Sequence, residues 1–259
     1  MLFDFPLHKF QQFIFVFVRV GAILISVPFF GSGNIPARLK VSLAFLVSLI
    51  SYPLIEFNGI IFPAGVLPLS ISLASEVFIG LIIGYSSRLV FAGVQMAGHL
   101  IGFQMGFGIV NVIDPSTSSQ ISVTSQFENI LAMLIFLSIN AHHWFLKGIV
   151  ESFSLIPLMG FHFTGAIAKM MVDMFKDIFI IGIKLGAPII AALFFTTIAL
   201  GLVARTVPQI NVFIIGFPLQ IGIGLLIMGL TMSFFNMAVK SIFVQMGNNM
   251  YLLMKGMGQ

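Results

Sequence analysis

One segment interrupts the hydrophobic runs of this chain: Gly102-Phe-Gln-Met-Gly-Phe-Gly-Ile-Val-Asn-Val-Ile-Asp114-Pro115, followed by Ser116-Thr-Ser-Ser-Gln120. Gly98, Gly102 and Gly106 recur every four residues at its start, and on an α-helix this spacing places them along one side. A stripe of small residues lets a neighbouring backbone come close, as it does in membrane helix packing. We therefore predict that this stripe packs against another helix.

The helix that carries the stripe is expected to end within this segment. Asp114-Pro115 is typical of a helix restart, with Asp as the cap and Pro at the first helical position. Ser125-Gln-Phe-Glu128 forms a capping-box pattern ahead of the apolar run 130–139. The sequence thus predicts a loop over about 107–124. Such a loop either joins two spans at the membrane surface or, at membrane depth, lines a pore, because irregular backbone is tolerated there only against protein or water.

Composition places the chain among membrane proteins. Of its 259 residues, 59% are hydrophobic and 8% are charged, whereas a soluble domain has about 25% charged residues. At roughly 20 apolar residues per span, this length suits five to seven helices. The net charge of +4 includes no basic run that would bind nucleic acid, and there is no cysteine. We predict an all-α, polytopic protein with about six hydrophobic segments and kinked helices.

The segments can be placed along the chain by their hydropathy and by the turn residues between them. They cover about 10–30, 41–55, 68–89 with a continuation through 90–106, 125–149, 169–203 and 212–251. Between the last two, Pro208 is expected to end one helix and Asn211 to cap the next. Together with Arg205 and Gln209, these residues form the turn of a predicted C-terminal helical hairpin.

Three charged residues fall inside apolar segments: Arg19, Glu76 and Lys184. A charge at the middle of a membrane costs about 2.5–3.5 kcal/mol, so each is expected to face a partner, a wet cavity or the outside of the bilayer. Three interpretations remain open. Glu76 and Lys184 form a structural pair, the charges serve an ion path in a transporter, or the helices pack mainly on other proteins in a larger assembly.

Enzyme chemistry finds no support in the sequence. The chain has no G-x-S-x-G, no G-x-x-x-x-G-K-[ST] and no H-E-x-x-H, the motifs of common nucleophile, phosphate and zinc sites. His142 and His143 adjoin, but adjacent residues on a helix point about 100° apart. We expect no catalytic residues, no metal site and no cofactor.

Several motifs together resemble the FliR family of the flagellar type III export gate, whose relatives include subunits of virulence injectisomes. These motifs are Gly102-Phe-Gln-Met-Gly-Phe107, Asp114-Pro115, the run from Leu131 to Asn140-Ala-His-His143, and Arg205-Thr-Val-Pro-Gln-Ile-Asn-Val-Phe213 with Gly216-Phe-Pro218. The resemblance covers nearly the whole chain in order and spacing. It implies a core subunit of a protein-export channel in the bacterial inner membrane, at the flagellar basal body.

The resemblance also implies partners and a division of the chain. It implies assembly with FliP and FliQ, contact with FlhB, FlhA nearby, surrounding membrane lipid, and unfolded flagellar proteins as the exported substrates. Within a single export-gate domain, residues 1–165 resemble FliP in fold and residues 166–259 resemble the FliQ hairpin.

In the family, the loop after the Gln-Met-Gly-Phe motif acts as a pore plug. Carried over to this chain, the plug covers 106–122 and includes Gly106, Phe107, Gly108, Ile109, Val110, Asn111, Asp114, Pro115 and Ser116. The alternative function is an ion-coupled secondary transporter, which requires repeated halves with matching broken helices. We find no clear internal repeat in this sequence.

Overall fold

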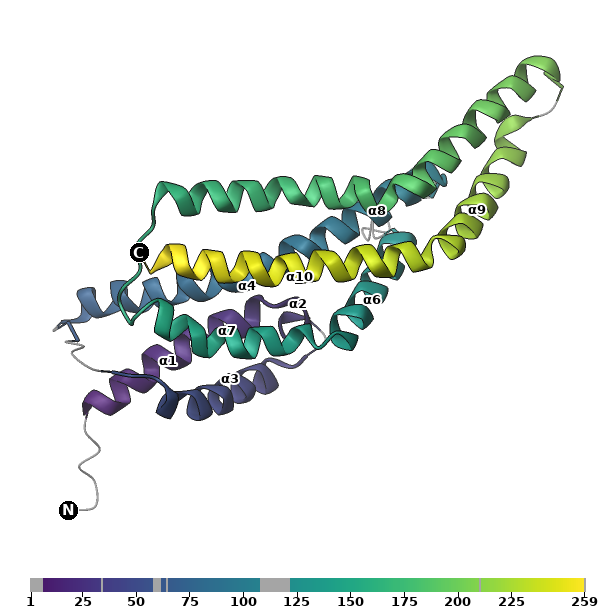
Figure 1. Ribbon diagram of the computed structural model, residues 1–259. Helices are drawn as coiled ribbons and strands as arrows, with labels where there is room; N and C mark the ends of the chain where they lie inside the picture. The colour runs from purple at the N-terminus through teal and green to yellow at the C-terminus, as the bar shows by residue number, and fades with distance from the viewer. Residues whose placement is uncertain are drawn as a thin grey trace. The chain divides into compact units, whose positions relative to one another are not determined.

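The computed structural model describes residues 7–33, 35–57, 62–63, 65–107, 122–209 and 211–258, and this part of the chain is helical without any strand. The elements follow in the order α1 (Leu7–Ser26), α2 (Pro28–Gly31), α3 (Ala37–Ser51), η1 (Tyr52–Leu54), α4 (Val66–Gln104), α6 (Val123–Ser138), α7 (Ala141–Leu155), α8 (Gly165–Thr206), α9 (Val212–Leu230) and α10 (Met232–Met257) (Figure 1). The predicted all-α class is confirmed.

Four of the described helices are long and apolar enough to cross a membrane: His8–Ser26, Ala37–Leu54, Val66–Gln104 and Gly165–Thr206. Two further pairs qualify if each bent pair counts as one span, and they bend by 64° between α6 and α7 and by 61° between α9 and α10. The described chain therefore offers four to six spans, in agreement with the six predicted hydrophobic segments. The two bends also confirm the prediction of kinked helices.

The first bend was not predicted, because a continuous hydrophobic segment was expected over 125–149. The structure interrupts this segment at Asn140, whose φ of 56° lies in the left-handed region. Asn adopts this region more readily than most residues, because its short side chain bonds to nearby backbone. The polar residue that ends the apolar run thus redirects the helix.

The chain divides into two compact units, and long helices contribute to both. Unit 1 comprises Met1–Leu89, Asn140–Met174 and Val244–Gln259. Within it, α1 packs on α3 through Phe13 and Phe45, whose rings lie 5.4 Å apart and edge to face. On α4, Gly80 lies so close to α1 that an added Cβ would lie 2.5 Å from the Ala22 Cβ. Glycine here allows close helix packing.

Unit 2 comprises Val90–Ile139 and Phe175–Phe243. Phe91, Phe136 and Phe243 form an aromatic triad in its core, with ring centroids 5.2–5.8 Å apart. In the same unit, α8 and α9 form the predicted C-terminal hairpin, and Figure 1 shows α9 returning alongside α8. Gln220 Nε2 donates to Thr197 Oγ1 across the hairpin at 3.1 Å.

Candidate functional site

The glycine stripe of α4 meets the start of α6. Gly98 and Gly102 are buried. A Cβ added at Gly98 would lie 2.7 Å from the backbone nitrogen of Ser125, and one added at Gly102 would lie 2.5 Å from Thr124 Oγ1. Thr124 Oγ1 also donates to the Gly98 carbonyl at 2.6 Å. The two helices therefore contact each other through backbone and hydroxyl groups, which side chains larger than glycine would separate.

The start of α6 differs from the predicted capping box. Helix α6 begins at Val123 with Ser122 as its N-cap residue, and Ser122 forms no side-chain capping bond. Ser125 lies in the first turn, where its Oγ donates to the Gln95 carbonyl of α4 at 3.2 Å. The capping-box prediction is wrong because the hydroxyl groups near this helix start bind the neighbouring helix instead of their own backbone.

Gly98→Leu is expected to separate the start of α6 from α4 and to destabilise unit 2 by about 3 kcal/mol, because overpacking against a backbone cannot be relieved by a rotamer change. The chain has no cysteine, so a cysteine pair introduced at Gln95 and Asn129 reports on this seam. The amide side chains of these two residues lie 3.4 Å apart. A short bifunctional thiol reagent should join the pair when Gly98 is present and fail to join it after Gly98→Leu.

The matched control for this experiment is Gly201→Leu, because a Cβ added at Gly201 would meet nothing within 4 Å. This substitution should leave the cross-link between positions 95 and 129 unchanged. Equal cross-linking in the Gly98→Leu and Gly201→Leu proteins would contradict the proposed close packing of α4 on α6.

The start of the candidate plug, at Gly106 and Phe107, packs against an apolar cluster in unit 2. Gly106 has a φ of 88°, a conformation that favours glycine. A Cβ at this position would also lie 2.6 Å from the Phe217 ring on α9. The next residue, Phe107, packs against a buried cluster that contains Ile101, Met105, Ile189 and Leu193. The chain thus leaves α4 against the inner face of the α8–α9 hairpin.

An apolar pocket of about 300 Å³ lies beside both described ends of this segment. Its lining residues are Phe107, Val123, Thr124, Phe127, Leu225, Met228, Gly229 and Met232. Phe107 precedes the segment 108–121 and Val123 follows it closely. The remaining predicted plug residues, Gly108, Ile109, Val110, Asn111, Asp114, Pro115 and Ser116, lie outside the described residues, as does the predicted restart at Asp114-Pro115.

Arg19 and Glu76 form an ion pair that is completely buried in unit 1. Arg19 Nε donates to Glu76 Oε2 at 2.5 Å, and both side chains have 0% exposure. Arg19 Nη1 also donates to the carbonyls of Ser152 at 2.9 Å and Ile156 at 2.8 Å. Glu76 Oε1 accepts a hydrogen bond from the Met159 amide at 3.0 Å. One ion pair therefore joins α1, α4, the end of α7 and the turn that follows it.

The predicted role of Lys184 needs correction. Lys184 is exposed on α8, so it is not a third buried charge within this chain. The expected pairing of Glu76 with Lys184 is also not what the structure shows, because the two oxygens of Glu76 bind Arg19 and Met159. Arg19 and Lys184 both lie in apolar segments of the sequence. Nothing in the sequence indicated which of them would pair with the Glu76 carboxylate.

The hairpin turn contains the predicted residues. Arg205 lies in the last turn of α8, and Pro208 and Gln209 are exposed in the connection. The Asn211 side chain accepts a hydrogen bond from the Ile214 amide at 3.4 Å, and the Asn211 carbonyl accepts from the same amide at 3.1 Å. Asn211 thus lies at the start of α9, as its capping signal predicted.

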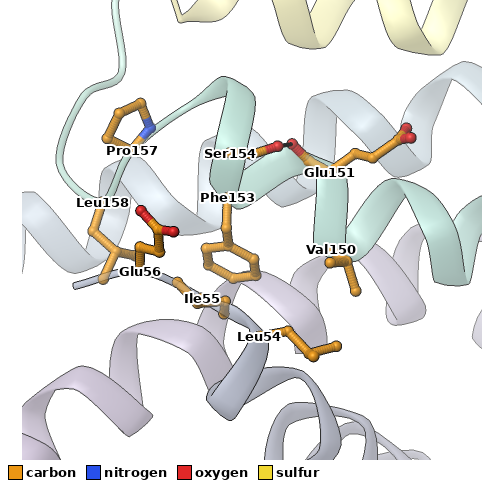
Figure 2. A pocket seen from close by; sticks show the side chains of 9 residues that line it. All are labelled: Leu54, Ile55, Glu56, Val150, Glu151, Phe153, Ser154, Pro157 and Leu158. Atoms are coloured by element: carbon orange, nitrogen blue, oxygen red, sulfur yellow. Dashed lines mark hydrogen bonds between the residues drawn. The ribbon is translucent and has the colours of Figure 1, made fainter. Parts of the chain in front are cut away.

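Unit 1 also has a cavity of about 510 Å³ whose lining residues are Leu54, Ile55, Glu56, Val150, Glu151, Phe153, Ser154, Pro157 and Leu158. Figure 2 shows the Phe153 ring between the backbone of α7 and Ile55, with the Glu56 carboxylate beside Leu158. The Arg19 guanidinium lies 4.3 Å over this ring, and Glu151 pairs with the exposed Lys147 at 3.4 Å. Among the described residues, no group of three His, Asp or Glu could hold a metal ion.

Two sets of contacts at these sites could not be predicted from the sequence. Phe217, which covers Gly106, belongs to the Gly216-Phe-Pro218 motif, but nothing in that motif indicated its contact. The carbonyl groups of Ser152 and Ile156, which bind Arg19, carry no side-chain signal.

Comparison with known proteins agrees with the motifs. Residues 10–246 match the family described as bacterial export proteins, family 1. The protein named flagellar biosynthetic protein FliR of Bacillus subtilis (strain 168) is 38% identical over 239 residues, which cover 90% of this chain and 91% of the relative. The FliR of Pectobacterium carotovorum subsp. carotovorum is 33% identical, with coverages of 85% and 84%, and that of Escherichia coli (strain K12) is 30% identical, with coverages of 83% and 82%.

These relatives are named for flagellar biosynthesis, and their names state no catalysed reaction. The resemblance inferred from the sequence motifs is confirmed. The chain therefore belongs to family 1 of the bacterial export proteins, the FliR family of flagellar biosynthesis.

Proposed function

We propose that this protein is a core subunit of the flagellar type III export gate, located in the bacterial inner membrane at the flagellar basal body. With FliP and FliQ it forms the channel through which unfolded flagellar proteins leave the cell. It contacts FlhB, and FlhA lies nearby. Membership of the export family supports this assignment. The exposed apolar side chains of the α8–α9 hairpin support assembly with other subunits.

The α8–α9 hairpin exposes many large apolar side chains. They include Phe194, Phe195, Ile198, Leu202, Ile214, Leu219, Leu225, Leu226 and Leu230. An apolar surface of this size marks a contact with protein or with membrane. The same hairpin exposes Lys184, Arg205 and the bonded pair of Thr197 and Gln220. Charged and polar groups are costly against lipid, and this mixture favours neighbouring subunits over lipid alone.

The segment 106–122 acts as the pore plug in this proposal. Its first residues pack on the hairpin through Phe107, and its last residue, Ser122, lies against α4 beside Gly102. Small and polar residues fill much of the sequence between these ends. Because α4 and α6 bind each other directly through Thr124 and Gly98, displacement of the plug does not require these helices to separate.

An ion-coupled transporter is the alternative function, and the buried charges do not favour it. Arg19 and Glu76 have 0% exposure, so this pair lines no aqueous path in this chain. Backbone groups of the same unit bind both side chains, and Arg19 Nη2 has no hydrogen-bond partner among the described residues. This arrangement is that of a structural pair.

The first test is the composition of the complex that a tagged copy of this chain retrieves from gently solubilised native membranes. We expect a large particle that contains FliP-like and FliQ-like subunits, identified by native mass measurement and peptide sequencing. Phe194→Ser with Phe195→Ser, at two exposed positions of α8, should reduce recovery of these subunits. The control is Gly201→Ala, in open space on the same helix, which should not reduce it. A lone monomer or homodimer from intact membranes would contradict the proposed function.

A further inference from the structure

A pocket in unit 1 combines apolar walls with a cation where α1, α2 and α3 meet. Its volume is about 250 Å³, and its lining residues are Leu24, Phe30, Ile35, Leu39, Lys40 and Leu43. Lys40 is the charged member of this lining, and the other five side chains are apolar. Leu39 is 61% exposed, so this wall of the pocket continues onto the outer surface of α3.

Lys40 lines this pocket, Arg88 comes close to the same Gly31 that Lys40 binds, and Arg38 precedes the lining residue Leu39 in the sequence. Lys40 Nζ donates to the Gly31 carbonyl at 3.1 Å. Arg88 donates to the carbonyls of Ser26 at 2.7 Å and Ile25 at 3.1 Å. Its Nη2 would lie only 3.3 Å from a Cβ added at Gly31, so Lys40 and Arg88 approach Gly31 together. The third cation, Arg38, is exposed next to Leu39.

Nothing in the surrounding sequence neutralises this positive charge. There is no Asp or Glu between Asp4 and Glu56. Helix α3 begins at Ala37 without an acidic residue in its first turn, and its N-cap residue, Pro36, forms no side-chain bond. The first turn of a helix has free N–H groups and a partial positive charge. Arg38 and Lys40 add two further positive charges at this end, an arrangement that an external anion would stabilise.

The position of α3 indicates where that anion comes from. Together with η1 it forms a candidate membrane span, Ala37–Leu54, which begins at the cationic turn. Lys and Arg at the ends of spans lie near the lipid headgroups, and anionic lipids attract them. Beyond the turn, the same helix exposes Phe45, Leu46, Leu49 and Ile50, a surface that suits acyl chains.

We propose that this pocket binds an anionic phospholipid. The lipid phosphate binds at Arg38, Lys40 and Arg88, and part of one acyl chain occupies the pocket between Leu24, Leu39 and Leu43. The charge of the three cations and the apolar lining together match this one ligand class, whereas an inorganic phosphate would leave the apolar walls uncovered. This inference does not depend on the proposed role in export.

The test is native mass spectrometry of the full-length protein in a mild detergent, with dioleoylphosphatidylglycerol and dioleoylphosphatidylcholine added at equal concentration. These lipids share their acyl chains and differ in headgroup charge. We expect preferential retention of the phosphatidylglycerol. Arg38→Gln should lower its retention about fivefold, because each Lys or Arg near an anionic lipid contributes about 1 kcal/mol, and retention of phosphatidylcholine should not change.

Two comparisons separate binding from misfolding. Lys40→Gln should weaken phosphatidylglycerol retention, whereas Lys40→Arg should preserve it, since Arg keeps the charge and a donor for the Gly31 carbonyl. Lys240→Gln removes the same charge from an exposed position in the other unit and should have no effect. Equal retention of the two lipids, or an Arg38→Gln protein that retains phosphatidylglycerol as the unchanged protein does, would overturn the proposal.

Discussion

Arg19→Met is expected to lower the free energy of unfolding by about 3–5 kcal/mol, because it leaves the buried Glu76 carboxylate without its charged partner. The carbonyls of Ser152 and Ile156 lose their donor at the same time. Trp144 is the single tryptophan of the chain and lies on α7 in the same unit. Its fluorescence during denaturant unfolding in detergent micelles measures the loss.

Further variants distinguish a charge effect from a general packing effect. Arg19→Met combined with Glu76→Met should recover part of the lost stability, since no charge remains buried. Charge reversal, Arg19→Glu with Glu76→Arg, should not recover it, because the new carboxylate would face the two carbonyls that Arg19 now binds. Lys184→Met removes an exposed cation and should change stability by about 0.5 kcal/mol at most. A similar loss for Arg19→Met and Lys184→Met would contradict the structural pair.

Deletion of Ile109–Gln120 is expected to open the assembled channel to small ions, since it removes most of the proposed plug. Purified complexes in planar bilayers should then carry a steady current that exceeds that of the intact complex by at least an order of magnitude. The shortened chain can still connect its two ends. The Phe107 amide bonds to the Gly102 carbonyl at 3.0 Å, and Ser122 lies beside the same glycine.

The controls for this deletion address the assembly and the sequence of the plug separately. The mass of the complex must equal that of the intact complex, which shows that the subunit still assembles. Ser116→Ala with Ser118→Ala and Ser119→Ala keeps the length and the apolar residues of the segment and should leave the channel closed. An intact particle that lacks 109–120 and conducts no better than the unchanged complex would eliminate the plug from the proposed function.

Much of the fold could be predicted because it depends on local sequence. The hydrophobic runs predicted the helices, and Pro208 and Asn211 predicted the position of the hairpin turn. Asn140 and Thr231 mark the bends that were missed. Both flanking stretches at each place favour a helix, so the sequence pattern cannot distinguish a bent pair from one long helix.

The sequence by itself determined the membrane class, the helical fold, the hairpin and the family, since composition, helix periodicity and motif order are properties of the chain alone. It also identified Arg19 and Glu76 as charges that require an explanation. Only the tertiary structure paired them with each other, left Lys184 exposed and directed the hydroxyls of α6 to the carbonyls of α4. The physical reason is that these partners lie far apart in sequence, and the backbone groups that complete them are present in every residue.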